Sequence, residues 1–370
     1  MMKLHLTTWL TGMLVVLATT FSMPVQAEPY LAVRTGTQCS ACHVNPTGGG
    51  MRNPAGTIIG NSMLPANKLE SPGAVGSPPW DGRITDYLSV GADLRASLRS
   101  TTTPTSGRLT AFSTERASVY IDLRLIPDRL SLYIDERVAP GIAFTREAYL
   151  LLRSADSGAY LKAGRLFLPY GLRLEDDRTF IRQVSGINFN SSDDGVEGGW
   201  AKGPWSVHLA LSNGSSGGTE TNNGKQLSLL ANLVYPLWRA GASYNVNSAS
   251  GADRKMGNLF GGLRTGPISW LGEIDYFVDD GTATGRRKSV ASLLEANTEV
   301  AKGHNLKLGY EFFDPDRTVA QNQRTRYSLA WEYTPFQGLQ LRTGYRHNRG
   351  IPQSSPQNSK ELFLQLHGYL

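Results

Sequence analysis

Residues 118–126 read SVYIDLRLI. Apolar side chains occupy every second position from Val119 to Leu125, and Tyr120, Asp122 and Arg124 stand between them. This period of two residues is that of a β-strand with one apolar face. The same alternation returns in RLSLYIDE (129–136), WSVHLALS (205–212), LQLRTGYR (339–346) and LFLQLHGYL (362–370). These stretches have about the length, roughly ten residues, at which a tilted strand crosses a bilayer.

The connections between these stretches alternate between short and long. Short turns are expected at 127–129, 155–158, 202–204, 265–267, 301–304 and 334–338. Longer polar loops are expected at 100–113, 168–193, 213–224, 247–256, 279–287, 314–323 and 347–360. Short turns on one rim and long loops on the other are typical of bacterial outer-membrane barrels, which have an even number of strands, here about sixteen. The predicted fold is all-β: a transmembrane antiparallel β-barrel over residues 81–370.

Aromatic residues favour this barrel over a periplasmic β-sandwich. They gather near the predicted strand ends, where the interfacial girdles of a barrel lie. The residues concerned are Trp205, Tyr235, Trp238, Trp331, Tyr333 and Tyr345. A soluble sandwich leaves both this pattern and the apolar face of nearly every strand unexplained.

The composition agrees with a barrel that has a wet interior. The chain has 370 residues, of which 40 are glycine, and its mean hydropathy is −0.27. The net charge of +6 is mild, and no basic cluster carries a nucleic-acid-binding motif, so we expect no nucleic-acid partner. The 2 cysteines lie in one motif, which excludes any other disulfide framework.

The N-terminus has the pattern of an export signal. Lys3 precedes an apolar run over 11–21 that is shorter than a membrane-spanning helix, and VQA (25–27) is a small-x-small cleavage pattern. We expect a signal peptide over residues 1–27, cleaved after Ala27, with an uncleaved anchor as the alternative. No later apolar run is long enough to span a membrane as a helix.

Residues 39–43 read CSACH, which has the spacing of a c-type haem attachment site. In such a site the thiols of Cys39 and Cys42 bond covalently to the haem, and the imidazole of His43 is the proximal iron ligand. The alternatives are a disulfide or a thioredoxin-like redox pair, but the sequence lacks the βαβ context of a redox pair. One covalent haem c is therefore the expected cofactor.

The sixth iron ligand has several candidates. Met51 follows the run 48–50 of three glycines, which lets the chain fold back over the ring, and Met63 lies in the apolar stretch IIGNSMLP (58–65). Each methionine is otherwise an ordinary packing residue. A histidine of the lumen or a water molecule remains as a further alternative.

Residues 28–80 are predicted to form a short haem-binding segment. Many prolines and few apolar residues leave it too small to build its own core, so we expect the barrel to supply the walls around it. Loop 168–193 is long and charged, and it either folds inward as a constriction or remains a solvated outer loop.

Several polar side chains are expected to face the lumen. They include His208, His367, Arg95, Arg124, Arg342 and Arg346. Arginine binds carboxylates in a bidentate manner, so the four arginines are candidates to pair with the haem propionates. The alternative for each of them is an ordinary solvated lumen wall.

The stretch YLAVRTGTQCSACHVNPTGGGMRNPAG (30–56) resembles the fused monohaem c-type cytochrome–porins of the bacterial outer membrane. The shared features are an export signal, the R-x-G-x-x-C-x-x-C-H pattern that ends at His43, and a porin-like barrel behind it. The barrel stretch YLKAGRLFLPYGLRLEDD (160–177) is similar to phosphate-type porins, in which a strand ends in a Pro-aromatic-Gly turn. The segment NPTGGGMRN (45–53) departs from the iron-oxidising members of the group. The resemblance implies electron transfer across the outer membrane, with iron oxidation at the cell surface among the activities of the group.

We therefore expect a non-enzymatic electron carrier whose haem is housed in the barrel lumen or at its periplasmic mouth. Its expected partners are outer-membrane lipid, periplasmic carriers such as soluble c-type cytochromes, and an extracellular electron donor or acceptor such as iron. The first alternative is a solute porin with a haem-bearing periplasmic plug or redox gate. The second is a haem enzyme such as a peroxidase, which needs an open distal site and an acid–base histidine, for which His208 and His367 are the candidates.

Overall fold

The computed structural model describes residues 28–67, 81–249, 252–282, 285–350 and 357–370. The predicted signal peptide (1–27) and residues 68–80 of the predicted haem segment lie outside these ranges. Within the described ranges, no helix has the length and apolar character needed to cross a membrane.

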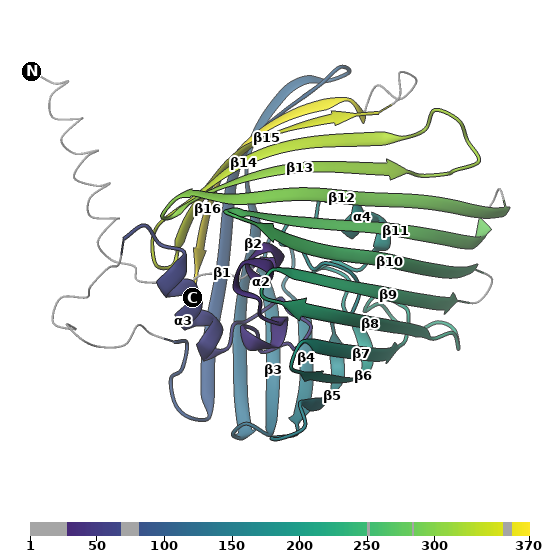
Figure 1. Ribbon diagram of the computed structural model, residues 1–370. Helices are drawn as coiled ribbons and strands as arrows, with labels where there is room; N and C mark the ends of the chain where they lie inside the picture. The colour runs from purple at the N-terminus through teal and green to yellow at the C-terminus, as the bar shows by residue number, and fades with distance from the viewer. Residues whose placement is uncertain (1–27, 68–80, 250–251, 283–284, 351–356) are drawn as a thin grey trace, which may run out of the picture.

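In the described part of the chain, sixteen antiparallel strands form a closed barrel (Figure 1). The strands follow chain order around the barrel, and β1 (Leu88–Thr103) closes it by pairing with β16 (Ser359–Tyr369). Closure satisfies the backbone of both end strands, as lipid requires. The predicted all-β barrel is confirmed. The other strands are β2 (Gly107–Ile126), β3 (Leu130–Ala139), β4 (Phe144–Arg153), β5 (Ala159–Leu166), β6 (Asp193–Lys202), β7 (Trp205–Ser212), β8 (Gln226–Tyr235), β9 (Trp238–Ala249), β10 (Ala252–Thr265), β11 (Ile268–Thr282), β12 (Gly285–Ala301), β13 (His304–Asp314), β14 (Arg324–Phe336) and β15 (Leu339–Arg349).

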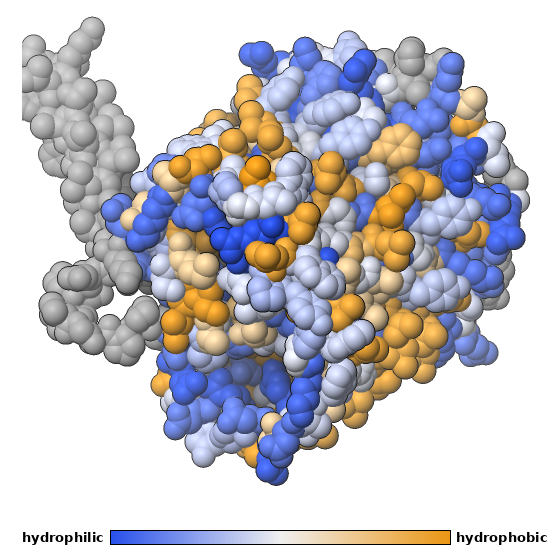
Figure 2. All heavy atoms as spheres, viewed as in Figure 1, coloured by the Kyte–Doolittle hydropathy of each residue, from blue (hydrophilic) through white to orange (hydrophobic). Residues whose placement is uncertain are grey.

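Burial alternates along the strands as the sequence pattern predicts. In β7, Ser206, His208 and Ala210 are buried inside the barrel, whereas Leu209 and Leu211 are about half exposed on its outer wall. Figure 2 shows apolar side chains gathered over the outer wall and hydrophilic residues toward the strand ends. An apolar outer band around a polar interior is the arrangement of a barrel that spans a lipid bilayer.

The short turns lie where the sequence predicts them, but part of the opposite rim differs from prediction. Loops occur near 213–224 and 314–323, whereas most of 100–113, 247–256 and 279–287 belongs to long strand hairpins. For example, Thr102 still pairs with Arg108 in the β1–β2 ladder. Above the bilayer a strand needs no apolar face, so the alternation of hydrophobicity stops while the hydrogen-bonded ladder continues.

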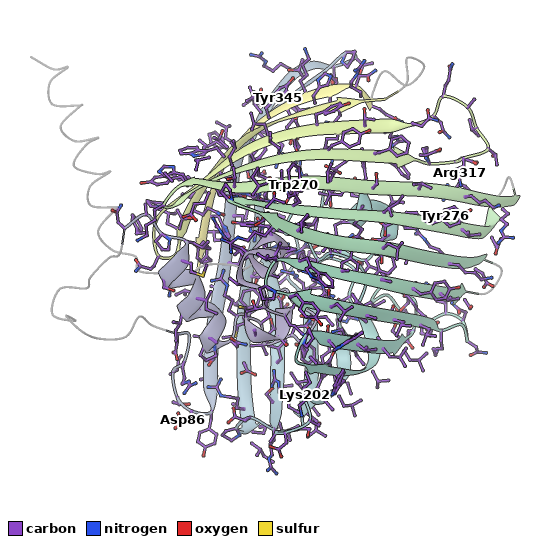
Figure 3. The ribbon with its side chains drawn as sticks, viewed as in Figure 1. Asp86, Lys202, Trp270, Tyr276, Arg317 and Tyr345 are labelled. Atoms are coloured by element: carbon purple, nitrogen blue, oxygen red, sulfur yellow. The ribbon has the colours of Figure 1, made fainter. Side chains whose placement is uncertain are left out.

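Aromatic side chains occupy the outer wall. Of the six residues predicted for the girdles, Tyr333 is half-buried and the other five are exposed. Figure 3 shows one of these five, Tyr345, together with Trp270 and Tyr276 on the wall, and charged residues at the two rims, Asp86, Lys202 and Arg317. This distribution is that of a barrel with interfacial aromatic residues.

Loop 168–193 folds into the lumen, which is the inward of its two predicted arrangements. It contains the helix α4 (Phe180–Ser185), whose Phe180 and Ile181 are buried. The backbone N–H of Leu172 donates to Glu273 of β11 (2.6 Å), and that of Phe180 donates to Glu311 of β13 (2.6 Å). The loop therefore reaches across the barrel as a constriction.

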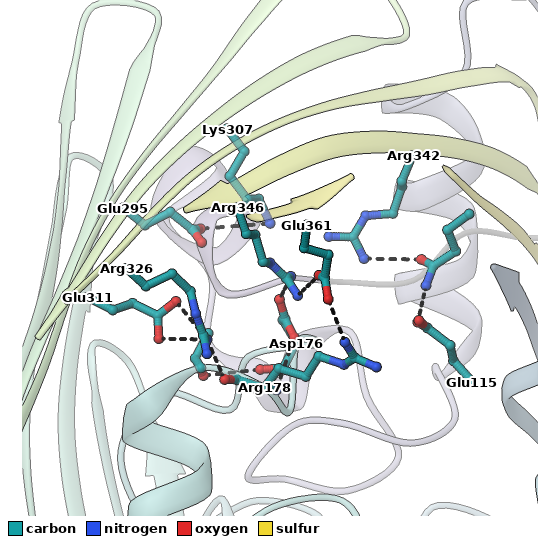
Figure 4. A network of polar contacts seen from close by, with 12 residues as sticks. Glu115, Asp176, Arg178, Glu295, Lys307, Glu311, Arg326, Arg342, Arg346 and Glu361 are labelled. Atoms are coloured by element: carbon teal, nitrogen blue, oxygen red, sulfur yellow. Dashed lines mark hydrogen bonds and ion pairs between the residues drawn. The ribbon is translucent and has the colours of Figure 1, made fainter. Parts of the chain in front are cut away.

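Ion pairs attach the same loop to the far wall (Figure 4). Asp176 pairs with Arg346 of β15, and Arg178 pairs with Glu361 of β16 at 3.2 Å. Arg346 also contacts Glu361 at 3.3 Å, so loop and wall share one network of charges. Networks of this kind hold a segment more firmly than single exposed pairs do.

Residues 28–67 lie at the short-turn end of the barrel and are called the plug segment below (Figure 1). The segment contains the helix α2 (Pro29–Thr35), the 3₁₀ turn η1 (Cys39–Ala41) and the helix α3 (Pro54–Met63). α2 packs inside the barrel against β8, β10 and β11.

Polar contacts tie the plug segment to the wall at many points around the barrel. Arg34 pairs with Glu299 of β12 at 2.5 Å, and Gln38 donates to the carbonyl of Gly203 in the β6–β7 turn at 2.8 Å. The backbone N–H of Ala66 donates to Thr334 of β14 (2.8 Å). These contacts come from different sides of the barrel, so the plug segment spans its lumen.

Candidate cofactor site

The motif residues form one helical turn. The backbone N–H groups of Cys42 and His43 both donate to the carbonyl of Cys39, at 3.1 and 3.0 Å. Residues three and four apart on a helical turn share a face. Accordingly Cys39, Cys42 and His43 line the same cavity. Both thiols are free, so the structure holds no disulfide between them.

The chain then turns back and clamps the motif. His43 pairs with Arg52 as an antiparallel bridge, and the backbone N–H of Val44 donates to the carbonyl of Met51 at 3.0 Å. Gly48, at the start of the turn, has a φ of +88°, a conformation that glycine adopts without strain. A side chain there would also meet the sulfur of Cys39 at 3.3 Å. The glycine run therefore keeps the space beside the first thiol open.

A cavity lies between the plug segment and the barrel wall. The two thiols and His43 line it on the plug side, His208 of β7 and Arg239 of β9 line it on the wall side, and residues 171–173 of the constriction loop also line it. The cavity therefore brings the motif together with side chains of the barrel wall and of the constriction loop.

Arg52 lines the cavity with a guanidinium group that lacks a hydrogen-bond partner. Its side chain is buried, 8% exposed, and none of its three nitrogens bonds to a described residue. Burial lowers the pKa of Arg52 to about 10. The ring of Tyr369 lies 5.8 Å away and offers only a weak cation–π contact. A buried guanidinium binds a carboxylate or phosphate in preference to other groups, so an anionic ligand fits beside Arg52.

The electrostatics of the motif favour metal binding. Burial, followed by the positive charges of Arg52 and Arg173, lowers the pKa of His43 to about 3. The imidazole is therefore neutral at neutral pH, which is the form that binds iron. Burial raises the pKa of the Cys42 thiol. Two free thiols, a neutral imidazole and an unpaired cation around one cavity fit a covalently bound haem and its propionates.

The four arginines proposed to pair with propionates do not fill that role. Their partners in the structure are carboxylates of the protein itself: Arg95 pairs with Asp93, Arg124 with Asp122, Arg342 with Glu332, and Arg346 with Asp176 and Glu361. Nor are they an ordinary solvated wall, because all four side chains are largely buried. The alternating pattern of a strand predicts that a residue faces inward, but not that a neighbouring strand supplies its counter-charge.

The structure separates the two candidate methionines. Met51 is 4% exposed, packs beside Gly82 and Gly91, and is absent from the residues that line the cavity. Met63 lines the cavity from the end of α3 and is 40% exposed.

The two candidate histidines also differ in position. Both are buried inside the barrel, as predicted. His208 lines the cavity, whereas His367 lies outside its lining and faces Gln340 (3.2 Å) and Asp93 (3.3 Å) with its two ring nitrogens. The cavity therefore brings together the CSACH motif, Met63 and His208.

Sequence reasoning missed Arg52, Arg173 and Arg239 as residues of the site. Arg52 immediately follows the Gly-Gly-Gly-Met run, but nothing in a single sequence marks it as buried. Arg173 donates to Thr47 (3.0 Å) and to the carbonyl of Leu168 (2.9 Å), so it joins the plug segment to the constriction loop. Such a contact depends on a loop that folds inward, which the sequence left open.

The barrel lumen is filled at the level of the plug segment and constriction loop. Lumen-facing polar side chains on many different strands are shielded from water. They are Asp93, Asp135, Glu147, Lys162, Asn245, Asp275, Asn297 and Glu332, each at most 1% exposed. Protein therefore covers the lumen wall at these positions.

Comparisons with known proteins show the fold. No protein-family model and no curated protein sequence matches the chain. Among solved structures, the anion-selective porin from Comamonas acidovorans aligns with a TM-score of 0.62 and 10% identity, over 76% of this chain and 99% of that one. A loop-deletion mutant of OmpT from Vibrio cholerae aligns at 0.60 with 14% identity, over 76% and 99% of the two chains. The channel DcaP of Acinetobacter baumannii aligns at 0.56 with 12% identity, over 76% and 97%. The protein thus has the fold of bacterial outer-membrane porins.

Proposed function

We propose that this protein is a monohaem c-type electron carrier of the bacterial outer membrane, with haem c bonded to Cys39 and Cys42 and His43 as its proximal ligand. The observation that carries the proposal is one cavity in which both thiols, the buried imidazole and the unpaired guanidinium of Arg52 meet. A bound haem c supplies one-electron exchange between Fe(II) and Fe(III).

The folded chain brings the groups of this site together. The helical turn of the motif presents the thiols and imidazole together, and the antiparallel bridge between His43 and Arg52 fixes the cation beside the imidazole. Arg52 supplies the counter-charge for a propionate, with Arg173 and Arg239 also in the cavity lining. Bulk water is excluded from His43, Arg52 and Arg239, whereas the two thiols remain partly exposed.

The filled lumen supports electron transfer over solute diffusion. A diffusion porin needs a wet path through its barrel, whereas the plug segment and constriction loop here bury charged groups on β1, β3, β4, β5, β9, β11, β12 and β14. Electron transfer needs no such path, but a single haem serves both sides of the membrane only where it lies within reach of the outer mouth or where further cytochromes complete the route.

The position of the cavity favours a periplasmic redox partner. Gln38, beside Cys39, is bound to the β6–β7 turn, and short turns lie on the periplasmic side of such barrels. Periplasmic carriers such as soluble c-type cytochromes exchange electrons at this rim. From the resemblance to cytochrome–porins we propose an extracellular electron donor or acceptor, such as iron, on the other side of the constriction loop.

Covalent haem attachment is the direct test. The full-length protein is produced with the c-type maturation machinery, purified in detergent, unfolded and examined by intact mass and by the pyridine haemochrome spectrum. We expect one haem per chain that survives unfolding, and none bound covalently in Cys39→Ser/Cys42→Ser. Ser40→Ala, a change within the same turn, is the matched control and keeps the haem. A wild-type chain that carries no covalent haem would overturn the proposal.

A further inference from the structure

His208 stands on the inner face of β7, in the wall of the cavity that contains the motif. Gln38, the residue before Cys39, donates to the carbonyl of Trp205 at 2.9 Å. His208 lies three residues further along the same strand, which is about 10 Å along the strand at about 3.3 Å per residue. The cavity occupies the space between this histidine and the motif.

A hydrogen-bond chain fixes the tautomer of His208. The hydroxyl of Tyr160 lies 2.5 Å from Oε1 of Glu197 and 2.6 Å from Nδ1 of His208. A phenol has one proton to donate, and the carboxylate of Glu197 is only an acceptor, so that proton goes to Glu197. The phenol oxygen then accepts Nδ1–H of His208, which leaves the lone pair of the ring on Nε2. In the described part of the chain, Nε2 makes no hydrogen bond.

The same chain continues to the proximal side of the site. Lys162 contacts Oε1 of Glu197 at 3.0 Å and donates to Oδ1 of Asn45 at 3.1 Å. Asn45, two residues after His43, donates in turn to Glu147 at 2.9 Å. Lys162, Glu197 and Asn45 are fully buried. One buried network therefore positions both His208 and the segment that carries His43.

Metal-binding histidines usually donate their second ring N–H to such an outer partner, which fixes the ring and its tautomer. The other candidates lack this preparation. Met63 is 40% exposed at the end of a short helix, Met51 is not among the residues that line the cavity, and both ring nitrogens of His367 have partners.

We propose that Nε2 of His208 is the sixth iron ligand, with Tyr160 and Glu197 as its positioning residues. This assignment rests on the proposed haem attachment at Cys39 and Cys42. It makes the iron six-coordinate with two imidazoles and leaves no open distal site of the kind a peroxidase needs.

The test measures spin state on chains whose covalent haem has first been verified. Wild-type protein is expected to show a low-spin ferric spectrum by electron paramagnetic resonance and to lack the near-infrared charge-transfer band of methionine ligation. His208→Ala is expected to become high-spin while keeping its covalent haem, and added imidazole is expected to restore the low-spin spectrum. His367→Gln and Met63→Leu are the matched controls and remain low-spin.

Two results would overturn the ligand and leave the proposed function intact. One is a His208→Ala protein that keeps both its covalent haem and an unchanged low-spin spectrum, with Met63→Leu converting instead. The other is a methionine charge-transfer band in the wild type, which needs no variant to fold. Absence of covalent haem from the wild type would instead overturn the proposed function, and the ligand assignment with it.

Discussion

Removing the charge of Arg52 is expected to have opposite effects in the haem-free and haem-loaded proteins. The guanidinium is buried and unpaired without haem, and burial lowers its pKa from 12.5 to about 10. At 1.36 kcal/mol per pKa unit, this corresponds to roughly 3 kcal/mol of destabilisation from holding the charged form in place. The cation–π contact with Tyr369 offsets about 0.5–1 kcal/mol of it. Arg52→Met keeps the apolar stem and is therefore expected to stabilise the docked plug segment by about 2 kcal/mol in the absence of haem.

With haem attached, the same change has the reverse sign. A hydrogen bond to a charged partner contributes about 1.5–3 kcal/mol, so Arg52→Met is expected to destabilise the loaded plug segment by about 2 kcal/mol. The stability effects of Arg52→Met in the haem-free and haem-loaded proteins differ by about 4 kcal/mol. A mutant cycle that combines Arg52→Met with the haem-free double change Cys39→Ser/Cys42→Ser measures this difference.

Amide hydrogen exchange of residues 39–53 in lipid vesicles reports the local opening free energy of the plug segment. Arg129→Met, which replaces an exposed arginine in the β2–β3 turn, is the control and shifts neither protein. An Arg52→Met change that destabilises both forms equally would refute the reasoning, because Arg52 would then be a packing residue without a ligand.

Three further predictions concern pH, the constriction loop and the lipid face. In the haem-free protein the pKa of folded His43 is about 3, below its unfolded value of 6.5. The unfolded state therefore binds more protons between these two values, and the stability of the folded protein decreases as the pH is lowered from 6.5 toward 3. Limited proteolysis should show the plug segment losing roughly 2–3 kcal/mol from neutral pH to pH ~4.5, except in His43→Gln. Arg346→Gln removes buried ion pairs and is expected to weaken the protection of residues 174–186 against hydrogen exchange by about 3 kcal/mol. The control is Arg165→Gln, which removes a more exposed ion pair and is expected to change this protection by less than about 1 kcal/mol. Equal effects of the two changes would contradict the packing of the loop inside the barrel. Leu209→Arg on the outer wall is expected to reduce unfolding stability in vesicles by about 2–4 kcal/mol, and no loss would place Leu209 outside the bilayer.

The barrel was predictable from sequence because its signal is repeated along the chain. Every strand must bury one face against lipid and turn the other inward, so stretches such as 205–212 carry the pattern independently of one another. The long hairpins at 100–113 and 279–287 were missed because they extend beyond the bilayer, where hydrophobicity no longer alternates.

The candidate site was predictable only where its chemistry is local. Covalent haem attachment requires a fixed spacing of Cys39, Cys42 and His43 within five consecutive residues, so the motif can be recognised in a single sequence. The cation and the distal histidine depend instead on which strands and loops face the motif in three dimensions. Arg95 and Arg342 pair with carboxylates, whereas Arg52 has no hydrogen-bond partner among the described residues. Both outcomes depend on tertiary packing, so the sequence pattern alone does not predict them.

The central claim is that one haem in this filled barrel moves electrons across the membrane. The direct measurement uses the full-length protein in liposomes that contain a sealed reductant, with a membrane-impermeant oxidant added outside and the haem spectrum followed over time. We expect the internal reducing equivalents to be lost through the wild type and retained in His43→Ala, while a small encapsulated dye stays inside both. A haem that remains reduced while the dye leaks out would contradict the claim and identify a solute porin with a haem-bearing plug.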